Sequence, residues 1–237
     1  MALPVLTTPT YELIVPSTKQ KVKFRPFLVK EEKALMIAHQ SEDANTMTNT
    51  LKDVITACTS NKLDVDKLAM FDIEYIFAQL RSKSVGEISQ IVLSCNKCND
   101  ANAKVNVDID ISKLEVSFSE NHTSDIKLFD DVGVKMKYPG MHTLNTLSSA
   151  NSQDIDNIFN VIVDCIDYIY DSNTVYPASE QTQKELTDFI SNLTQEQFTK
   201  LQNFFETMPK LEKQIEFDCP VCGYHHKQVI QGLESFF

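Results

Sequence analysis

The sequence predicts an α+β fold, and three features of the chain support this prediction. Apolar residues recur at helical spacing over 29–82, apolar and polar residues alternate strictly over 103–111, and two Cys-x-x-Cys pairs each lie between strand-like runs. We therefore expect an N-terminal hairpin plus helices, followed by a β-rich lobe that carries both Cys pairs and is interrupted by a helical insertion. The corresponding division of the chain is 1–84, 85–140, 141–208 and 209–237.

The N-terminal lobe opens with two short strand-like runs, 11–15 and 20–25, separated by a Pro-Ser-Thr-Lys turn. Three helices follow in the order 29–40, 44–59 and 72–82. Leu35 and Ile37 belong to the apolar face expected of the first helix, and Asp72 is a candidate N-cap of the third.

In the rest of the chain, the spacing of apolar residues changes from helical to alternating and then back to helical. Strands are expected at 88–95, 103–111, 114–118, 126–129 and 134–138. A single long helix is then expected over 154–170, because its isoleucines recur on one side. Two more helices follow at 180–193 and 194–208, the second opened by a capping box from Thr194 to Gln197. The last 25 residues return to a strand, a Cys pair and a strand.

Composition excludes several classes of function. A net charge of −11, from 22 basic and 33 acidic residues, disfavours nucleic-acid binding, which requires clustered Lys and Arg. No apolar run approaches the roughly 20 residues needed to cross a bilayer, and the N-terminus does not resemble a signal peptide. With only five glycines, the chain has no phosphate-binding loop motif. We expect a protein partner and a reducing cytoplasm, where paired cysteines bind metal more often than they form disulfides.

The four paired cysteines carry the strongest chemical signal. Two cysteines three residues apart on a tight turn present both thiolates to one ion, as in the knuckles of zinc ribbons and rubredoxins. Gly223 and Asn99 follow the two pairs, and both residue types tolerate a left-handed backbone. We therefore expect one structural zinc ion, with iron as the alternative, and sulfur atoms about 3.5–4 Å apart, given metal–sulfur bonds near 2.3 Å. The predicted ligands are Cys95, Cys98, Cys219 and Cys222.

The two pairs are separated by 120 residues, which suggests a zinc-ribbon-like lobe split by an insertion. Thioredoxin-like redox chemistry is the less favoured alternative, because such a Cys pair opens a helix whereas these pairs lead into strands. Disulfides or unconnected surface cysteines are the remaining alternatives. Four thiolates would leave no open coordination position, so the expected site is structural and not catalytic.

Other candidate residues are weaker. Of His225 and His226, we expect one to face solvent and the other to pack, although either could replace a cysteine as ligand. Cys58 and Cys165 lie on apolar helical faces and are expected to be buried, unreactive thiols. No histidine has a nucleophile or an acid at a telling spacing. The sequence therefore does not predict an enzyme.

Three stretches of the sequence resemble the baseplate hub proteins of T-even-type contractile-tailed phages, known as hub subunits or hub assembly proteins. These stretches are VKFRPFLVKEEK (22–33), FDIEYIF with LRSKSVGE (71–87), and the C-terminal knuckle with its GLESFF ending. The resemblance covers most of the chain and is weakest over 110–205. It implies a late protein of virion assembly that binds other tail or baseplate hub proteins in the host cytoplasm, and it supplies no catalytic residues.

The leading hypothesis is therefore a baseplate hub component or assembly factor, located in the host cytoplasm during assembly or in the virion baseplate. A cytoplasmic zinc-ribbon adaptor or regulator unrelated to phage tails is the alternative. The apolar ends of the chain, MALPVL and ESFF, are the expected anchors for a partner, because a partner can order large apolar groups at chain termini.

Overall fold

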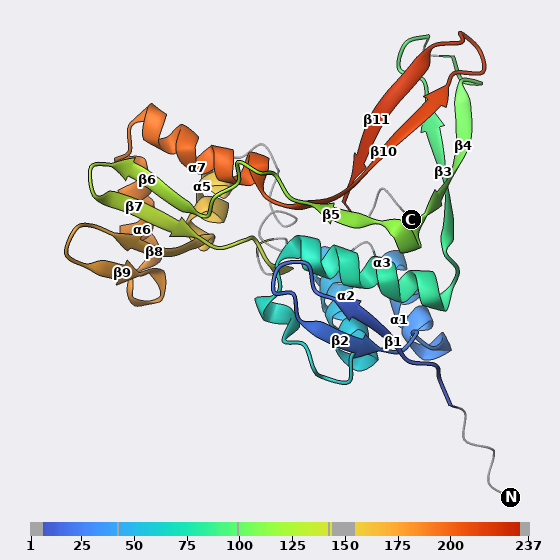
Figure 1. Cartoon of the computed structure of the whole chain (residues 1–237), viewed down its shortest axis with the longest axis horizontal. Helices are drawn as coiled ribbons and strands as arrows, with labels where there is room; N and C mark the ends of the chain where they lie inside the picture. Colours follow the sequence, from blue (N-terminus) through green and yellow to red (C-terminus); the bar gives the residue numbers. More distant parts are fainter. Residues whose placement is uncertain (1–6, 42, 99, 142, 144–154, 233–237) are drawn as a thin grey trace, which may run out of the picture. The chain divides into compact units, whose positions relative to one another are not determined.

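The computed structural model describes residues 7–41, 43–98, 100–141, 143 and 155–232. The chain divides into two compact units, whose helices and strands are labelled in Figure 1. Unit 1 consists of Met1–Val65, Phe71–Ser117 and Lys210–Phe237, and unit 2 consists of Asp66–Met70 and Phe118–Pro209. Both units contain helices and antiparallel strands, which confirms the α+β class. Within the described ranges, every helix is too short or too polar for a membrane span.

Unit 1 begins with a hairpin followed by helices. The hairpin consists of β1 (Tyr11–Ile14) and β2 (Lys21–Phe24), and the helices are α1 (Val29–Gln40), α2 (Ala44–Cys58) and α3 (Met70–Ser84). Side chains alternate across the hairpin, so that Val22 and Phe24 are buried while Lys21 and Lys23 are exposed. In α3, Ile73, Ile76 and Leu80 are fully buried, because their spacing places them on one face of the helix.

Helix α1 is the least buried of these helices. Its buried residues are Glu31 and Ala38, whereas Ile37, which we expected on a buried apolar face, is 55% exposed. The Glu31 carboxylate accepts hydrogen bonds from the Leu28 N–H at 2.7 Å and from Arg25 Nη2 at 2.9 Å. A charged anchor at the first turn therefore holds α1 in place, and much of its apolar surface remains outside the core.

Two long hairpins form the β-rich part of unit 1, here called the knuckle lobe. They are β3 (Ile88–Ser94) with β4 (Lys104–Asp110), and β10 (Lys210–Asp218) with β11 (His225–Gln231). Strand β5 (Glu115–Ser117) extends the second hairpin in the order β11-β10-β5. The hairpins bury Ile109, Leu211, Ile215 and Ile230 in one apolar cluster. Figure 1 shows them side by side, with their turns at the same end.

In the part of unit 2 that the structure describes, helices accompany a four-stranded antiparallel sheet. The strands follow the order β6 (Asp125–Phe129), β7 (Val132–Met136), β8 (Ile166–Tyr170) and β9 (Val175–Pro177). The helices are α5 (Ile155–Asp164), α6 (Gln183–Ser191) and α7 (Gln195–Thr207). The predicted capping box of α7 is confirmed, since Thr194 accepts from the Gln197 N–H and Gln197 accepts from the Thr194 N–H. Leu201 and Phe204 of α7 reach the buried core.

The prediction of one helix over 154–170 is wrong at its C-terminal half. Helix α5 ends at Asp164, and the chain enters β8 two residues later. The sequence IDYIY is rich in aromatic and β-branched residues, which favour a strand. Strand β8 pairs with β7 on one side and with β9 on the other. This pairing outweighs the helical spacing of the isoleucines.

The remaining sequence predictions for the fold concern Asp72, Asn99, the two chain ends and the domain boundaries. Asp72 is not a helix cap: its carboxylate is fully buried in α3 and accepts hydrogen bonds from the backbone N–H (2.9 Å) and the hydroxyl of Ser17. Asn99 and both apolar chain ends lie outside the described residues. The division of the chain at 84, 140 and 208 stays a prediction.

Candidate metal centre

Each Cys pair occupies the turn that closes one hairpin of the knuckle lobe. The N–H of Cys95 donates to the carbonyl of Ala103, and the N–H of Cys219 donates to the carbonyl of Tyr224, both at 2.9 Å. Each bond joins the residue directly after one strand to the residue directly before the next strand. Gly223 has φ +68°, so the left-handed conformation predicted for this position is confirmed. The same local chemistry therefore builds both turns.

The structure brings the two turns together, and the four sulfur atoms form one group, here called the cysteine cluster. Its members are Cys95, Cys98, Cys219 and Cys222, whose Sγ atoms all lie within 4.8 Å of one another. Two distances between the turns, Cys95 Sγ to Cys222 Sγ and Cys98 Sγ to Cys219 Sγ, are both 3.8 Å. A tetrahedral ion with bonds near 2.3 Å would place its sulfur ligands about 3.8 Å apart. The donor set and its spacing are therefore compatible with a bound metal ion.

Backbone amides favour ionisation of one thiol in each turn. The N–H of Cys222 is the main cause that lowers the pKa of Cys219 to about 7. Burial opposes ionisation of Cys95, but backbone N–H groups, among them that of Lys97, outweigh it and lower the Cys95 pKa. At Cys98 a backbone N–H lowers the pKa, but burial and the neighbouring thiols outweigh it and raise the pKa to about 12. Two thiols with lowered pKa values suit the binding of a divalent cation, because metal ligands must be deprotonated.

The two histidines beside the second turn differ, as the sequence predicted. His225 is exposed, and its Nδ1 lies 2.7 Å from a carboxylate oxygen of Asp218. His226 is buried, with its ring stacked on Phe217, and its Nε2 lies 3.2 Å from Cys95 Sγ. The sequence did not predict this last contact, because the two residues are 131 positions apart.

The two remaining cysteines are buried and separate from the cysteine cluster. Burial raises the pKa of Cys58 to about 11 and that of Cys165 to about 12. Both therefore stay protonated at neutral pH, as expected for unreactive thiols.

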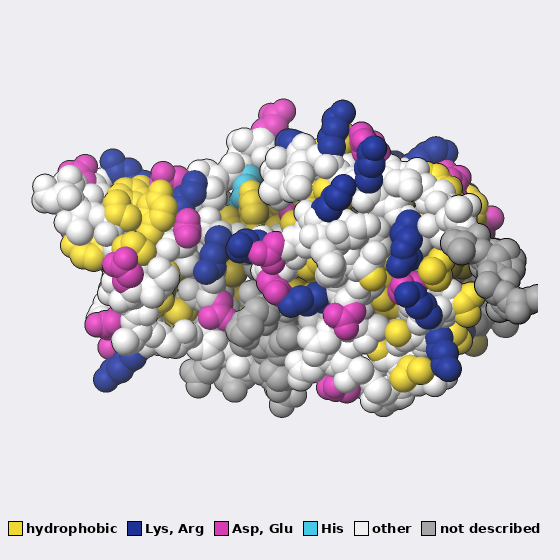
Figure 2. All heavy atoms as spheres, turned by 90° about the horizontal axis from the view of Figure 1, so that it is seen from below, with side chains coloured by type: hydrophobic (Ala, Val, Ile, Leu, Met, Phe, Trp, Pro, Cys, Tyr) yellow, Lys and Arg dark blue, Asp and Glu magenta, His cyan; other side chains and the backbone are white. Residues whose placement is uncertain are grey.

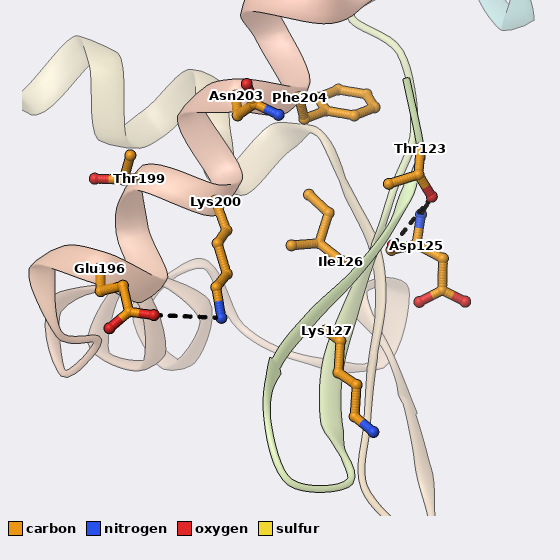
Figure 3. Close-up of a pocket in the computed structure, with 9 residues that line it drawn as sticks. All are labelled: Thr123, Asp125, Ile126, Lys127, Glu196, Thr199, Lys200, Asn203 and Phe204. Carbon is orange, nitrogen blue, oxygen red and sulfur yellow. Dashed lines mark hydrogen bonds and ion pairs between the residues drawn. The ribbon is translucent and has the colours of Figure 1, made fainter. Parts of the chain in front are cut away.

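A groove in unit 2 is a second candidate site, and Figure 3 shows it between β6 and α7. Its volume is about 520 Å³, and its lining includes Ile126, Phe204 and Lys200. The Lys200 ammonium donates to the Leu128 carbonyl at 3.0 Å and lies 3.9 Å from Glu196. The charged group of the groove therefore already has protein partners. No cysteine or histidine is among the nine lining residues. The cysteine cluster is therefore the better-supported functional site.

Comparisons with known proteins agree with the resemblance seen in the sequence. The model of a family described as T4 bacteriophage base plate protein matches residues 8–237, so the chain belongs to this family and is a bacteriophage baseplate protein. A curated relative, the baseplate hub assembly protein gp26 of Enterobacteria phage T4, is 24% identical over 216 residues. The alignment covers 91% of this chain and 92% of the relative. No solved structure matches the chain.

Proposed function

We propose that this protein is a non-enzymatic component or assembly factor of the phage baseplate hub, and that it acts by binding other hub proteins. The observation that carries this proposal is the family match over residues 8–237. The similarity to a hub assembly protein along nearly its whole length supports the hub in particular. Assembly takes place in the host cytoplasm, and the finished baseplate is the second location. The family match disfavours an adaptor unrelated to phage tails.

We further propose that the cysteine cluster binds one zinc ion, or iron as the alternative, and that the knuckle lobe is a split zinc-ribbon-like module. The equal sulfur–sulfur distances of 3.8 Å and the amide donors to the sulfurs support this assignment. Zinc in such a site supplies folding free energy by joining its ligands, and its four thiolates close the coordination sphere. The centre is therefore structural.

The outward face of α1 is the contact surface that we propose for a hub partner. Val29, Met36 and Ile37 are 80%, 59% and 55% exposed, and helical spacing places them along one face with Lys33. Residues 19–33, which run from the hairpin into α1, hold six basic and two acidic residues, whereas the whole chain holds 22 basic and 33 acidic residues. Both acidic residues, Glu31 and Glu32, lie in the first turn of α1, and four of the basic residues precede the helix. Figure 2 shows that basic, acidic and exposed apolar side chains are interspersed on one face of the molecule.

This local charge defines the kind of partner. A surface that combines apolar side chains with lysines fits a protein that presents apolar anchors with an acidic rim. A nucleic acid would use the lysines but would leave the large apolar side chains of α1 without contacts.

Purification of the tagged protein from infected cells, followed by mass spectrometry, tests the proposed function. We expect baseplate hub proteins to co-purify, and comparison of virions with lysate shows whether the protein stays in the particle. Co-purification with host transcription or translation proteins alone would support the adaptor and reject the hub role. Native mass spectrometry should separately show one metal equivalent per chain.

A further inference from the structure

The imidazole ring of His226 is held rigidly beside the cysteine cluster. His226 lies on β11, and its side chain is only 8% exposed. Its ring is stacked on Phe217 of β10, with centroids 4.6 Å apart and planes inclined by 9°. Tyr224 meets the same ring edge-on, with centroids 4.7 Å apart. Because two aromatic neighbours constrain the ring, the direction of its Nε2 atom is well defined.

The contact made by this ring joins the two turns. Nε2 of His226, which follows the second Cys pair, lies 3.2 Å from Sγ of Cys95, which begins the first pair. The same sulfur accepts the N–H of Lys97 at 3.3 Å. The imidazole is not a member of the group of ligand atoms that lie within 4.8 Å of one another, a group that contains only the four sulfurs among the described residues. The geometry is that of a donor to a ligand and not of a fifth ligand.

A donor at this position has a physical purpose. Four thiolates around a divalent ion leave a net charge of −2, and Cys95 and Cys219 are buried, where an uncompensated charge is costly. Hydrogen bonds to metal-bound thiolates offset this charge and fix the orientation of the ligands.

We propose that His226 is a positioning residue of the metal centre. Its Nε2–H donates to the Cys95 thiolate, orients that sulfur towards the ion, and connects the first Cys pair to the second hairpin. The proposal rests on the proposed metal centre and concerns a residue outside its ligand set. His225, the neighbouring residue in the sequence, points to carboxylates on the exposed side and has no such role.

Two substitutions at His226 and one at His225 test the proposal. His226→Phe keeps an aromatic ring against Phe217 but removes the donor, whereas His226→Gln retains an amide N–H. His225→Phe is the matched control. The measurements are metal content, the Co²⁺ absorption spectrum, and the rate at which zinc is transferred to a chelator.

We expect His226→Phe to bind one metal equivalent through four sulfurs but to release it faster than the wild type, because loss of a partner of a metal ligand usually costs about 10–100-fold in metal affinity. The release rate of His226→Gln should lie between those of His226→Phe and the wild type, and the release rate of His225→Phe should match that of the wild type.

Three outcomes would overturn the proposal. Equal release rates for the wild type and both His226 variants would show that the donor does not hold the sulfur. A nitrogen ligand in the wild-type Co²⁺ spectrum that is lost in His226→Phe would make His226 a ligand. A folded wild type that binds neither zinc nor Co²⁺ would reject the metal centre itself, whether or not the protein binds hub proteins. If His226→Phe does not fold, the comparison of His226→Gln with the wild type decides the question.

Discussion

The knuckle lobe and unit 2 are both built on antiparallel strands, yet they are stabilised in different ways. Among its described residues, unit 2 buries thirteen hydrophobic residues in one cluster, which joins its sheet to its helices. At the tip of the knuckle lobe, the buried cluster consists of Cys95, Ala103 and Cys219, with Cys98 packed against it. An apolar core thus accounts for the stability of unit 2, whereas the tips of the two hairpins have little apolar surface to join them.

This difference indicates where the proposed metal ion would contribute most to stability. An isolated two-stranded hairpin is at best marginally stable in water. The apolar cluster around Leu211 and Ile215 supports the base of the knuckle lobe, but the turns lie beyond it. A cross-link between the turns would join segments that are far apart in sequence, which makes the order of the lobe depend on the ion.

The largest expected effect follows from removal of a ligand. Cys219→Ser, or treatment of the wild type with a chelator, should destabilise the knuckle lobe by several kcal/mol, because metal binding contributes directly to folding. Hydrogen exchange should accelerate at amides of β3, β4, β10 and β11 and remain unchanged in β7 and β8. Cys58→Ser removes a buried thiol outside the cluster and should leave this pattern as in the wild type. Equal acceleration of hydrogen exchange in both units would contradict the idea that the ion stabilises the knuckle lobe alone.

The reciprocal change removes part of the core of unit 2. Leu201 is fully buried in α7, and Leu201→Ala should cost about 2–5 kcal/mol through lost burial and a cavity. Metal content and the Co²⁺ spectrum should be unchanged, because the cysteine cluster belongs to unit 1. Val175→Ala, at a position that is 56% exposed, is the control and should have little effect on stability. Loss of metal in Leu201→Ala would show that the two units are coupled.

A smaller effect, dependent on pH, is expected at Glu31. Burial raises the pKa of Glu31, but hydrogen bonds from Arg25 and the Leu28 N–H outweigh burial and lower it below 4.5. Because the folded-state pKa is lowered, the stabilisation is fully present above about pH 4.5, the pKa of an unperturbed Glu. It is lost as the pH falls through the folded-state pKa.

Glu31→Gln should therefore destabilise unit 1 by about 1–3 kcal/mol at pH 7, and the difference from wild type should shrink in acid. Urea unfolding at a series of pH values measures this difference. Glu12→Gln disrupts an exposed ion pair with Lys21 and should change stability far less. A difference that stays constant down to pH 3 would exclude the ionised carboxylate as its cause.

The smallest effect on stability is expected on the outward face of α1. Met36→Glu replaces a side chain that is 59% exposed, so the free energy of unfolding should change by no more than about 0.5 kcal/mol. Co-purification of hub proteins should nevertheless decrease, because the substitution places a negative charge where an acidic partner is proposed to bind. Val175→Glu, a similar substitution in unit 2, is the control. Undiminished binding by Met36→Glu would reject this surface but not the hub function.

Local patterns in the sequence predicted much of this structure. The bounds of α1 were predicted correctly from helical spacing, and the turn at Gly223 was predicted from the conformational freedom of glycine. The four cysteines that the sequence grouped by their spacing lie together in the structure. Each of these predictions depends on interactions within a few residues or on a side-chain chemistry that only certain partners satisfy.

The sequence did not predict features that depend on distant partners. Strand β8 has helical spacing of its isoleucines, and only its pairing with β7 and β9 makes it a strand. Ile37 has an apolar side chain of the kind that core positions carry, yet it is 55% exposed. Its exposure depends on which distant elements pack against α1. The contact between His226 and Cys95 required knowledge of how the two turns meet.

The pairing of β5 with β10 has a consequence for how this protein can change over evolution. The chain leaves the knuckle lobe after Ser117 and re-enters it at Lys210, and these two residues are direct partners in the sheet. Because the sheet holds Ser117 and Lys210 opposite each other, the length of the segment between them does not affect the register of β10 with β11. The entropy of closing such a segment grows only with the logarithm of its length. We therefore expect residues 118–209 to tolerate changes in length, because the pairing of Ser117 with Lys210 holds the sheet register that positions Cys219 and Cys222.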